Sequence, residues 1–313
     1  MNAVIDHGED GIAAKTGMAM AAPQAVGEGF ECIAPAKVNL WLRVTGRRHD
    51  GFHLLDSLVV FVSVADTISV RPAAESKLTV SGPYAPGLSG APDDNIVLRS
   101  ADLMAKAAGE RATPLSIHLS KVLPVASGIG GGSADAAAVI RCLARLWNID
   151  VPAGAENNIV TLGADVPMCV RSATAFVSGI GDALEPGPAA LSGLGVLLVN
   201  PGQPVSTPAV FKARTGAFSD PVTRPDPGAG TDAHIAAIAA AGNDLEAPAS
   251  RICPEIVKVL GALDDQADIL HAGLSGSGAT CFGLFHEKCV AEAAGQAVAA
   301  AHPSWWCRAG VIL

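Results

Sequence analysis

A glycine-rich segment over residues 124–138 has the residue types and spacing best suited to chemistry in this sequence. Alternating apolar residues before it predict a half-buried strand over 115–119, and apolar residues at helical spacing after it predict a helix reaching Trp147. The glycines then lie where the helix begins. Backbone N–H groups are unpaired at a helix start and carry part of a positive charge, and glycines let them approach a polyphosphate closely. The candidate phosphate-binding residues are Pro124, Val125, Ala126, Ser127, Gly128, Ile129, Gly130, Gly131, Gly132, Ser133 and Ala134.

Other glycine loops fit this segment less well. A Walker loop needs Lys followed by Ser or Thr after its last glycine, and Ser133-Ala134 at that place excludes it. A dinucleotide fingerprint needs glycines at its first, third and sixth positions; Gly128 and Gly130 supply two, but the sixth is Ser133. A tight strand-to-helix turn that binds nothing stays open, although three consecutive glycines carry an entropic cost.

A strand predicted to begin at Cys32 carries a second set of polar side chains. Alternation predicts one face made of Val38, Leu40, Leu42 and Val44, and an opposite face made of Lys37, Asn39, Trp41 and Arg43. A solvated edge charge is the ordinary explanation of such a lysine. The small residues over 34–36, with a fixed turn at Pro35, would instead let a ligand approach closely.

One acid stands in a small, apolar setting after the central loop. Asp165 lies within Leu-Gly-Ala-Asp-Val-Pro-Met over residues 162–168. It can be a plain helix cap. If it faces the phosphate loop, it is a candidate base for a hydroxyl, and Lys37 is the nearby cation that keeps it ionised. The two would then form a catalytic pair.

Two further turns can serve either structure or recognition. Residues 47–53, Arg-Arg-His-Asp-Gly-Phe-His, read as a hairpin turn with its tight point at Asp50-Gly51, leading to a strand over 58–64. The same residues offer hydrogen bonds and a stacking face for a heterocyclic base. Near the C-terminus, the turn over 275–278 is Ser-Gly-Ser-Gly, which explains a hairpin and could also supply backbone donors to a ligand.

These turns and loops need an architecture that brings them together. Strands are predicted over 67–71, 77–81 and 196–199, and helices over 207–215, 233–241 and 255–263. A further helix is predicted from a cap at Asp93-Asp94 through Gly109, with Val97 and Met104 on its buried stripe. The C-terminal order, from the strand over 196–199 through strands over 269–274 and 280–285 and a helix over 287–301 to a strand over 305–312, is β-α-β-β-α-β once extra helices are set aside. We expect an α+β fold with a disordered extension over 1–30, a catalytic domain over 31–187 and a ferredoxin-like domain over 188–313.

Composition limits the function classes. The chain has 313 residues, half of them hydrophobic, and no apolar run approaches the length of about 18 residues that a membrane span needs. A net charge of −9 argues against a general nucleic-acid binder. Seven cysteines without a CxxC pair fit neither a disulfide framework nor a zinc site, which favours a reducing cytoplasm.

Taken together, three motifs resemble those of the GHMP small-molecule kinases. They are the loop over 124–138, the strand Ala-Pro-Ala-Lys-Val-Asn-Leu over 34–40, and the turn Leu-Ser-Gly-Ser-Gly-Ala-Thr over 274–280. The turn over 47–53, the segment over 162–167, Val-Ser-Thr-Pro over 205–208 with Phe211, and Asn-Asp-Leu-Glu over 243–246 resemble the branch that phosphorylates a cytidine diphosphate ester of methylerythritol. The resemblance covers about residues 33–313.

The resemblance implies a two-domain GHMP kinase fold and transfer of a phosphoryl group from ATP, with Mg²⁺, to the C2 hydroxyl of that ester in non-mevalonate isoprenoid biosynthesis. It assigns proton removal to Asp165, with Lys37 holding it charged. It implies a small-molecule substrate without nucleic-acid or membrane partners, and we expect a monomer or weak homodimer. The implied substrate-binding residues are Asn39, Phe52, His53, Phe211, Gly276, Ser277 and Gly278.

Two departures from the family pattern stand out. Phe52 replaces a usual tyrosine, which keeps stacking but removes a phenolic hydrogen bond. Ala134-Asp135 replaces the commoner Ser-Asn, and no protein ligand of the metal is assigned, so that phosphates and water would hold the ion. A sister kinase acting on homoserine, mevalonate or a sugar, and a non-catalytic nucleotide sensor, remain the alternatives.

Overall fold

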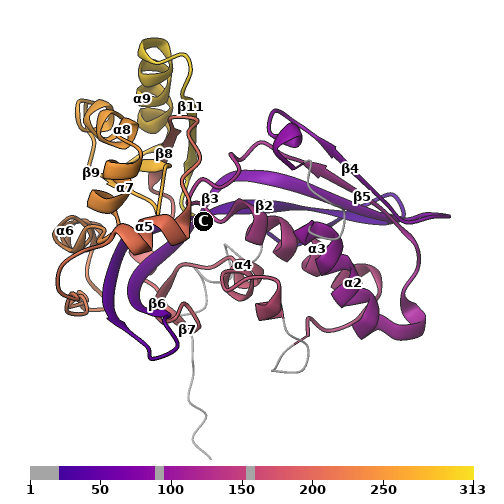
Figure 1. Cartoon of the computed structure of the whole chain (residues 1–313). Coiled ribbons are helices and arrows are strands. Elements are labelled where there is room, and N and C mark those ends of the chain that lie inside the picture. Colours follow the sequence, from indigo (N-terminus) through magenta and orange to yellow (C-terminus); the bar gives the residue numbers. More distant parts are fainter. Residues whose placement is uncertain (1–20, 89–94, 153–158) are drawn as a thin grey trace, which may run out of the picture.

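Two long antiparallel strands, β2 (Gly29–Arg47) and β3 (His53–Pro72), run through the middle of the molecule (Figure 1). The computed structural model describes residues 21–88, 95–152 and 159–313. In the large sheet the strand order is β1-β2-β3-β5-β4, with β6 beside β3 and β7 beside β6. Its other strands are β1 (Gln24–Val26), β4 (Lys77–Ser81), β5 (Leu115–Ser120), β6 (Ala175–Gly179) and β7 (Ala183–Pro186).

A second, antiparallel sheet with the order β11-β8-β10-β9 follows in the chain. Its strands are β8 (Gly195–Asn200), β9 (His271–Leu274), β10 (Cys281–Phe285) and β11 (Trp306–Val311). Together with α8 and α9, they confirm the expected β-α-β-β-α-β succession. The chain passes from one sheet to the other between Pro186 and Gly195; a domain boundary at residues 187–188 stays a prediction.

The helices cover the outer faces of the two sheets. Figure 1 shows α2 and α3 beside the large sheet and α8 and α9 beside the small one. Three 3-10 turns, η3 (Gly109–Arg111), η4 (Ile159–Thr161) and η5 (Ala189–Leu191), and a fourth, η1 (Ala85–Leu88), lie in connections. The α-helices are α2 (Ile96–Ala108), α3 (Gly131–Leu146), α4 (Val166–Arg171), α5 (Thr207–Ala213), α6 (Thr231–Ala241), α7 (Glu246–Ile252), α8 (Glu255–Asp264) and α9 (Lys288–Ala301).

Three hydrophobic cores hold these layers together. Side chains such as Phe61 on the large sheet pack against α2 and α3 in the first core. The opposite face of the same sheet, with Val38 and Val60, packs against Leu198 and Phe282 of the small sheet in the second. The third core lies between the small sheet and helices α7 to α9. Burial of apolar surface on both faces of each sheet therefore fixes the stacking of the two sheets, and with it the region where functional loops meet.

A β-bulge at Leu40 corrects the predicted faces of β2. Asn39 pairs with Val59 and Trp41 pairs with Leu58, which leaves Leu40 as the extra residue. One extra residue reverses the alternation beyond it. Trp41 is consequently buried in the second core, and Leu42 shares a face with Lys37 and Asn39 instead of lying opposite them.

Other boundaries also differ from the predictions. Residues 1–20 of the expected extension over 1–30 lie outside the described residues. In its last residues, β1 pairs with the start of β2 through a turn at Gly27, so this end of the extension is ordered. The expected cap at Asp93-Asp94 lies outside the described residues, and Asn95 caps α2 by accepting from the N–H of Val97. The strands predicted over 58–64 and 67–71 are one strand, and α7 was not predicted.

The described part of the chain contains no helix of the length and apolar character needed to cross a membrane.

A buried ionic cluster joins the large sheet to α3. The ammonium of Lys121 lies 2.6 Å from carboxylate oxygens of both Asp66 and Asp135, and all three residues are buried. Asp66 also accepts from the N–H groups of Val122 and Leu123. Oδ1 of Asp135 is buried without a hydrogen-bond partner. The departure at Asp135 thus places a carboxyl group against Lys121, next to the glycine-rich loop.

We predict that Asp135 makes stability depend on pH. Burial raises the pKa of Asp135 from 3.8 to about 8, although the charge of Lys121 acts in the opposite direction. Between these values the folded protein holds a proton that the unfolded chain releases, so the free energy of unfolding falls as pH rises toward 8. Asp135→Asn should remove this slope, which reaches at most about 1.4 kcal/mol per pH unit. Urea unfolding at pH 6, 7 and 8 measures it.

The exposed Asp102→Asn on α2 is the matched control and should leave the slope unchanged. Parallel pH curves for the Asp135→Asn and wild-type proteins would contradict the buried-proton account.

Candidate active site

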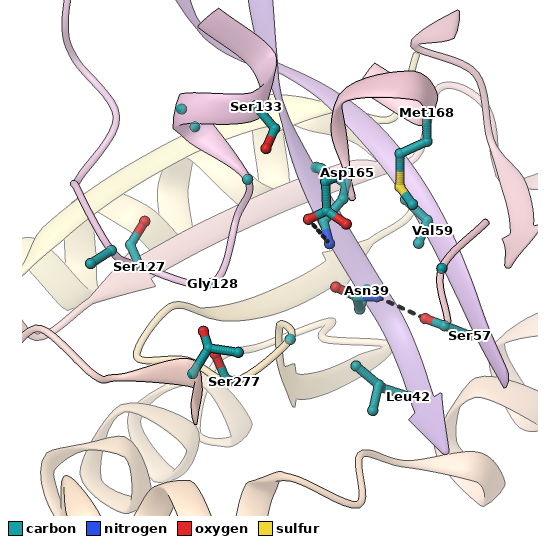
Figure 2. A pocket seen from close by; sticks show the side chains of 18 of the residues that line it. Asn39, Leu42, Ser57, Val59, Ser127, Gly128, Ser133, Asp165, Met168 and Ser277 are labelled. Atoms are coloured by element: carbon teal, nitrogen blue, oxygen red, sulfur yellow. Dashed lines mark hydrogen bonds and ion pairs between the residues drawn. The ribbon is translucent and has the colours of Figure 1, made fainter. Parts of the chain in front are cut away.

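A cavity of about 450 Å³ lies where the glycine-rich loop, β2, the start of α4 and the 275–278 turn meet (Figure 2). The two sheets and their helices thereby contribute to one site. Most of the sequence-predicted residues line it. They are Lys37, Asn39, Pro124, Val125, Ala126, Ser127, Gly128, Gly130, Gly131, Gly132, Ser133, Asp165, Phe211, Gly276 and Ser277.

The loop reaches its shape through glycines in left-handed conformations. Gly128 has φ +79°, and a Cβ there would lie 2.5 Å from the carbonyl oxygen of Ser275. Gly130, with φ +64°, is the N-cap of α3, and a Cβ on it would lie 3.3 Å from Cβ of Lys37. Gly131, Gly132 and Ser133, in the first turn of α3, line the cavity, and N–H groups at a helix start have no partner within the helix. Glycine at these two positions therefore lets the loop lie directly against β2 and the 275–278 turn.

Lys37 and Asp165 form an ion pair inside the cavity. The distance from Nζ of Lys37 to Oδ2 of Asp165 is 3.1 Å; the lysine side chain is 9% exposed and the aspartate side chain 37%. Asp165 is the N-cap residue of α4, but its side chain makes no capping hydrogen bond. The helix-cap interpretation of this carboxylate is therefore wrong, and its partner is the lysine that alternation placed on β2. The carboxylate remains open to the cavity.

Asn39 is oriented by a short chain of hydrogen bonds. Its Nδ2 donates to Oγ of Ser57 at 2.8 Å, and that hydroxyl donates to the carbonyl of Trp41. Oδ1 of Asn39 is buried without a hydrogen-bond partner. Figure 2 shows Asn39 between Asp165 and Leu42, with its amide nitrogen directed at Ser57. Asn39 itself lines the cavity, so the arrangement leaves one unsatisfied acceptor next to it.

Ser275 connects the second sheet to the phosphate loop. Its hydroxyl donates to the carbonyl of Gly128 at 3.0 Å and accepts from the N–H of Asn39 at 3.2 Å. The N–H of Thr280 donates to the carbonyl of Ser127. The 275–278 turn, predicted only as a hairpin or a source of ligand contacts, thus also fixes the position of the loop.

Five predicted site residues lie outside the lining of this cavity. Ile129 and Ala134 are buried in hydrophobic cores, and Gly278 closes the 275–278 turn with its N–H donating to the carbonyl of Ser275. Phe52 is 60% exposed. His53 stacks on Phe211, with ring centroids 4.7 Å apart.

Sequence reasoning missed several lining residues. Thr207 shares a hydroxyl hydrogen bond of 2.7 Å with Ser277, and Ser57 and Lys121 also line the cavity. Thr207 belongs to the Val-Ser-Thr-Pro segment that contributes to the family resemblance, so the sequence could have identified it as a site residue. Ser57 and Lys121 stand in ordinary strand-like contexts, and only the tertiary fold places them at the site.

Two family models match the chain. "GHMP kinases N terminal domain" matches residues 95–183, and "GHMP kinases C terminal" matches residues 232–304. The first range contains the glycine-rich loop and Asp165, and the second contains the 275–278 turn.

Curated relatives match over most of their length. The 4-diphosphocytidyl-2-C-methyl-D-erythritol kinase of Paramagnetospirillum magneticum is 50% identical, covering 88% of this chain and 96% of that one. The enzyme of the same name from Ruegeria pomeroyi is 48% identical, covering 91% and 99%.

The chain also superposes on solved structures. A crystal structure of 4-(cytidine 5'-diphospho)-2C-methyl-D-erythritol kinase superposes with a TM-score of 0.74 at 34% identity, covering 90% of this chain and 99% of that one. Homoserine kinase from Cytophaga hutchinsonii superposes with a TM-score of 0.63 at 17% identity, covering 92% and 96%, a likeness of fold alone.

We predict that Gly128→Ala damages the loop. A Cβ cannot lie 2.5 Å from a carbonyl oxygen, and the left-handed φ adds strain of about 1–3 kcal/mol, so the loop must move away from Ser275. The Kd for ATP should rise about tenfold, since one lost charge-assisted hydrogen bond has that value. Isothermal calorimetry measures it.

Gly261→Ala is the matched control, because that helical glycine has no heavy atom within 4 Å of an added Cβ. An unchanged affinity for ATP in Gly128→Ala would show that the loop does not need this close approach.

Proposed function

We propose that this chain, which belongs to the GHMP kinase family and is therefore a phosphotransferase, transfers the γ-phosphoryl group of ATP to the C2 hydroxyl of 4-diphosphocytidyl-2-C-methyl-D-erythritol. The observation that carries the proposal is the Lys37–Asp165 ion pair, which opens into the same cavity as the phosphate loop. The names of the relatives with high identity and coverage supply the substrate.

The phosphate loop would stabilise charge on the transferred group. Transfer of a phosphoryl group spreads negative charge over its oxygens, and preorganised donors that meet this charge lower the barrier. The unpaired N–H groups at the start of α3 and the hydroxyl of Ser133 are such donors in this site. Because the loop is held from both sides by Lys37 and Ser275, these donors need little reorganisation.

Asp165 would act as the general base. Its carboxylate accepts the proton of the C2 hydroxyl while the hydroxyl oxygen bonds to the γ-phosphorus and the bond from that phosphorus to the departing ADP oxygen breaks. Oδ2 is held by Lys37, which fixes the direction of the carboxylate. In the described part of the chain, Oδ1 has no assigned hydrogen-bond donor, so it is the oxygen available to the substrate.

Asn39 would position the acceptor molecule. Ser57 holds its amide so that Oδ1 keeps an unsatisfied acceptor. A buried polar group without a partner costs about 1–3 kcal/mol, which a substrate hydroxyl donating to it would recover. Such a contact would hold a polyol hydroxyl beside the Lys37–Asp165 pair.

His53 and Phe211 would receive the cytosine base, as the family resemblance implies. Their rings already stack, and a base can extend the stack or insert beside it. Phe52 is exposed and does not line the cavity, so its part in base binding rests on the resemblance alone. Gly276 and Ser277 line the cavity near Thr207, and their backbone groups would contact the substrate.

Mg²⁺ would enter this site with the nucleotide and be held mainly by phosphates and water, as the family resemblance implies. The described residues contain no group of three or more His, Cys, Asp or Glu that could hold a metal. Asp135, the acid nearest the loop in sequence, is committed to Lys121. The hydroxyl of Ser133 is the available protein donor, and the bound ion would neutralise phosphate charge. A cytoplasmic location stays a prediction from the cysteine content, and a monomeric or weakly dimeric state stays an expectation.

A substrate panel tests the proposal. We expect release of ADP from Mg-ATP with 4-diphosphocytidyl-2-C-methyl-D-erythritol, at a kcat/KM about 100-fold or more above that for homoserine, mevalonate or galactose, because only the first supplies a base for the His53–Phe211 stack. Reactions without an acceptor give the background ATPase rate. Turnover of another alcohol would discard the base-recognition part, and ATP binding without any turnover would point to a nucleotide sensor.

A further inference from the structure

Two cysteines that are distant in sequence meet in the first hydrophobic core. Cys32 of β2 and Cys142 of α3 are both buried, and the thiol of Cys142 donates to Sγ of Cys32 across 3.3 Å. Sγ of Cys32 also lies 3.4 Å from the carbonyl oxygen of Ala138, one turn earlier on α3. A disulfide bond, about 2.0 Å long, requires only a small approach of two sulfur atoms already in contact. Neither cysteine lines the reaction cavity, so the proposed kinase chemistry does not account for the pair.

A guanidinium group without a carboxylate partner lies beside the pair. The side chain of Arg141, next to Cys142 on α3, donates to the carbonyl of Ile33 on β2 at 2.9 Å. It also donates to the carbonyl of Cys169 and the hydroxyl of Ser172, which are neutral groups as well. Nε of Arg141 is buried without a hydrogen-bond partner. Within the described ranges, Arg141 forms no ion pair with an aspartate or glutamate.

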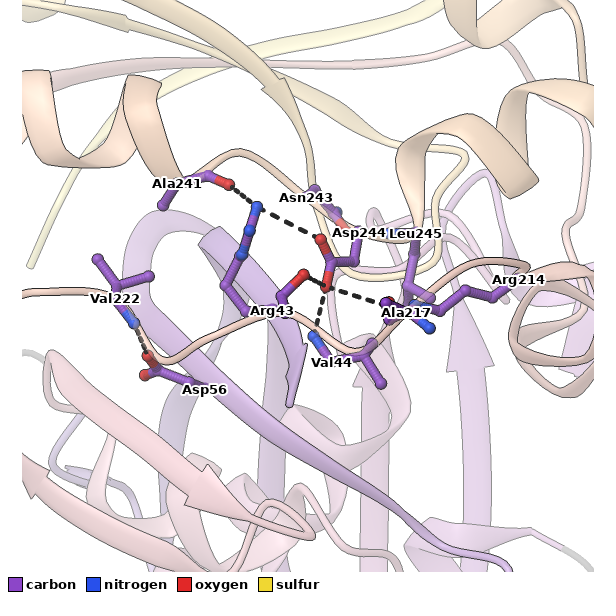
Figure 3. Close-up of polar contacts among 11 residues, drawn as sticks. Arg43, Val44, Asp56, Arg214, Ala217, Val222, Ala241, Asn243, Asp244 and Leu245 are labelled. Atoms are coloured by element: carbon purple, nitrogen blue, oxygen red, sulfur yellow. Dashed lines mark hydrogen bonds and ion pairs between the residues drawn. The ribbon is translucent and has the colours of Figure 1, made fainter. Parts of the chain in front are cut away.

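Other half-buried guanidinium groups do have a carboxylate as counter-ion. Arg214 lies 3.6 Å from Asp244, and Arg43 lies 3.4 Å from the same carboxylate (Figure 3). Such pairing is expected, because a charge removed from water without a counter-ion is costly. The charge of Arg141 therefore favours an anion in its surroundings, and a thiolate is one such anion.

The thiols around Arg141 differ in acidity. The hydrogen bond from Cys142 lowers the pKa of Cys32, and the charge of Arg141 lowers it further, against the opposing effects of burial and of Glu31. Donation to Cys32, together with burial, raises the pKa of Cys142. Burial raises the pKa of Cys169. Because the thiolate is the nucleophile in sulfur chemistry, Cys32 is the reactive member of the pair and Cys142 is its partner.

We propose that Cys32 and Cys142 form a peroxide-reactive site that closes a reversible disulfide between β2 and α3. The thiolate of Cys32 bonds to one oxygen of hydrogen peroxide, the O–O bond breaks, and the departing hydroxide takes up a proton to become water. Sγ of Cys142 then bonds to the sulfenic sulfur of Cys32, the S–O bond breaks, and the second hydroxide takes the proton of Cys142. Two thiols thus lose two electrons to one peroxide, and a dithiol reductant reverses the change.

Burial of the pair selects a small oxidant. Cys32 is 4% exposed, and Cys142 is fully buried. Thiol–disulfide exchange requires direct access of a bulky disulfide to the attacking sulfur, whereas hydrogen peroxide is hardly larger than water. The site should therefore respond to peroxide and not to oxidised glutathione.

Peptide mapping of the wild-type protein tests the site without reference to kinase activity. After brief treatment with hydrogen peroxide, digestion and mass spectrometry without reductant should find the peptides of Cys32 and Cys142 joined, and a dithiol should release them. Oxidised glutathione at the same concentration should give at least about tenfold less of this product. Cys169, beside the same Arg141, is the buried control and should stay reduced. Cys289 is the exposed control and should also stay reduced, because its hydrogen bond to Glu287 raises its pKa.

Variants separate the roles of the two cysteines. In Cys142→Ala, oxidation of Cys32 should stop at the sulfenic acid, which dimedone labels, whereas in Cys32→Ala no label should appear on Cys142. Arg141→Met should slow the labelling of Cys32 at least about fivefold relative to Arg141→Lys, which keeps the charge. Thermal unfolding checks that each variant is folded.

The oxidised wild-type protein should also be more stable than the reduced one. A disulfide between positions 32 and 142 closes a long loop of the chain, so the Tm should rise by at least about 5 °C, and dithiothreitol should abolish the rise. A joined pair with a lowered Tm would mean that the bond forms only in an opened protein, which contradicts the native contact.

Three further results would overturn the proposal. They are the absence of joined peptides in the wild-type protein, oxidation of Cys169 or Cys289 to the same extent as Cys32, and labelling of Cys142 in Cys32→Ala. Because none of these measurements involves turnover, they are independent of the proposed function.

Discussion

The contact between Lys37 and Asp165 is the interaction on which the rest of the site depends. It joins the middle of β2 to the start of α4 across the glycine-rich loop, and it requires the loop to leave room for a lysine side chain. Gly130 meets this requirement because a Cβ would lie only 3.3–3.5 Å from Cβ and Cε of Lys37. The N–H of Lys37 donates in turn to the carbonyl of Ile129. The lysine that orients Asp165 therefore also anchors the glycine-rich loop.

The second sheet completes this arrangement from the opposite side. Ser275 bridges the carbonyl of Gly128 and the N–H of Asn39, so a turn contributed by the C-terminal half of the chain fixes the distance between the loop and β2. Underneath, Lys121 connects α3 to β3 through two aspartates. Removing charges from water offsets most of their attraction, so such a buried cluster adds little to stability. The phosphate loop is thus held by a backbone contact, a hydroxyl bridge and an ionic cluster.

Much of the fold could be predicted because local sequence and tertiary structure agree there. The glycines of the loop, the alternation of β5 and the apolar stripe of α3 each report one element, and each element lies where expected. The bulge at Leu40 could not be predicted, since a single extra residue leaves no mark in a run of alternating side chains. Lys121 and Ser57 gained their places only through contacts distant in sequence. The arginines of the hairpin turn were recognised as a possible base site, but the sequence does not distinguish Arg47, which lines a cavity, from Arg48, which pairs with Asp50.

The claim that Lys37 and Asp165 act as one catalytic unit is tested most directly by a double-mutant cycle on kcat. Lys37→Met and Asp165→Asn are compared with the double variant, and thermal unfolding checks that all three are folded. If the two residues act as one unit, replacing either removes the contribution of both. Each single change should then lower kcat about 10³-fold, and the double variant should be no more than a few-fold worse than either single variant. A double variant that loses about 10⁶-fold, the product of the single losses, would mean that the two residues act independently and would contradict the account.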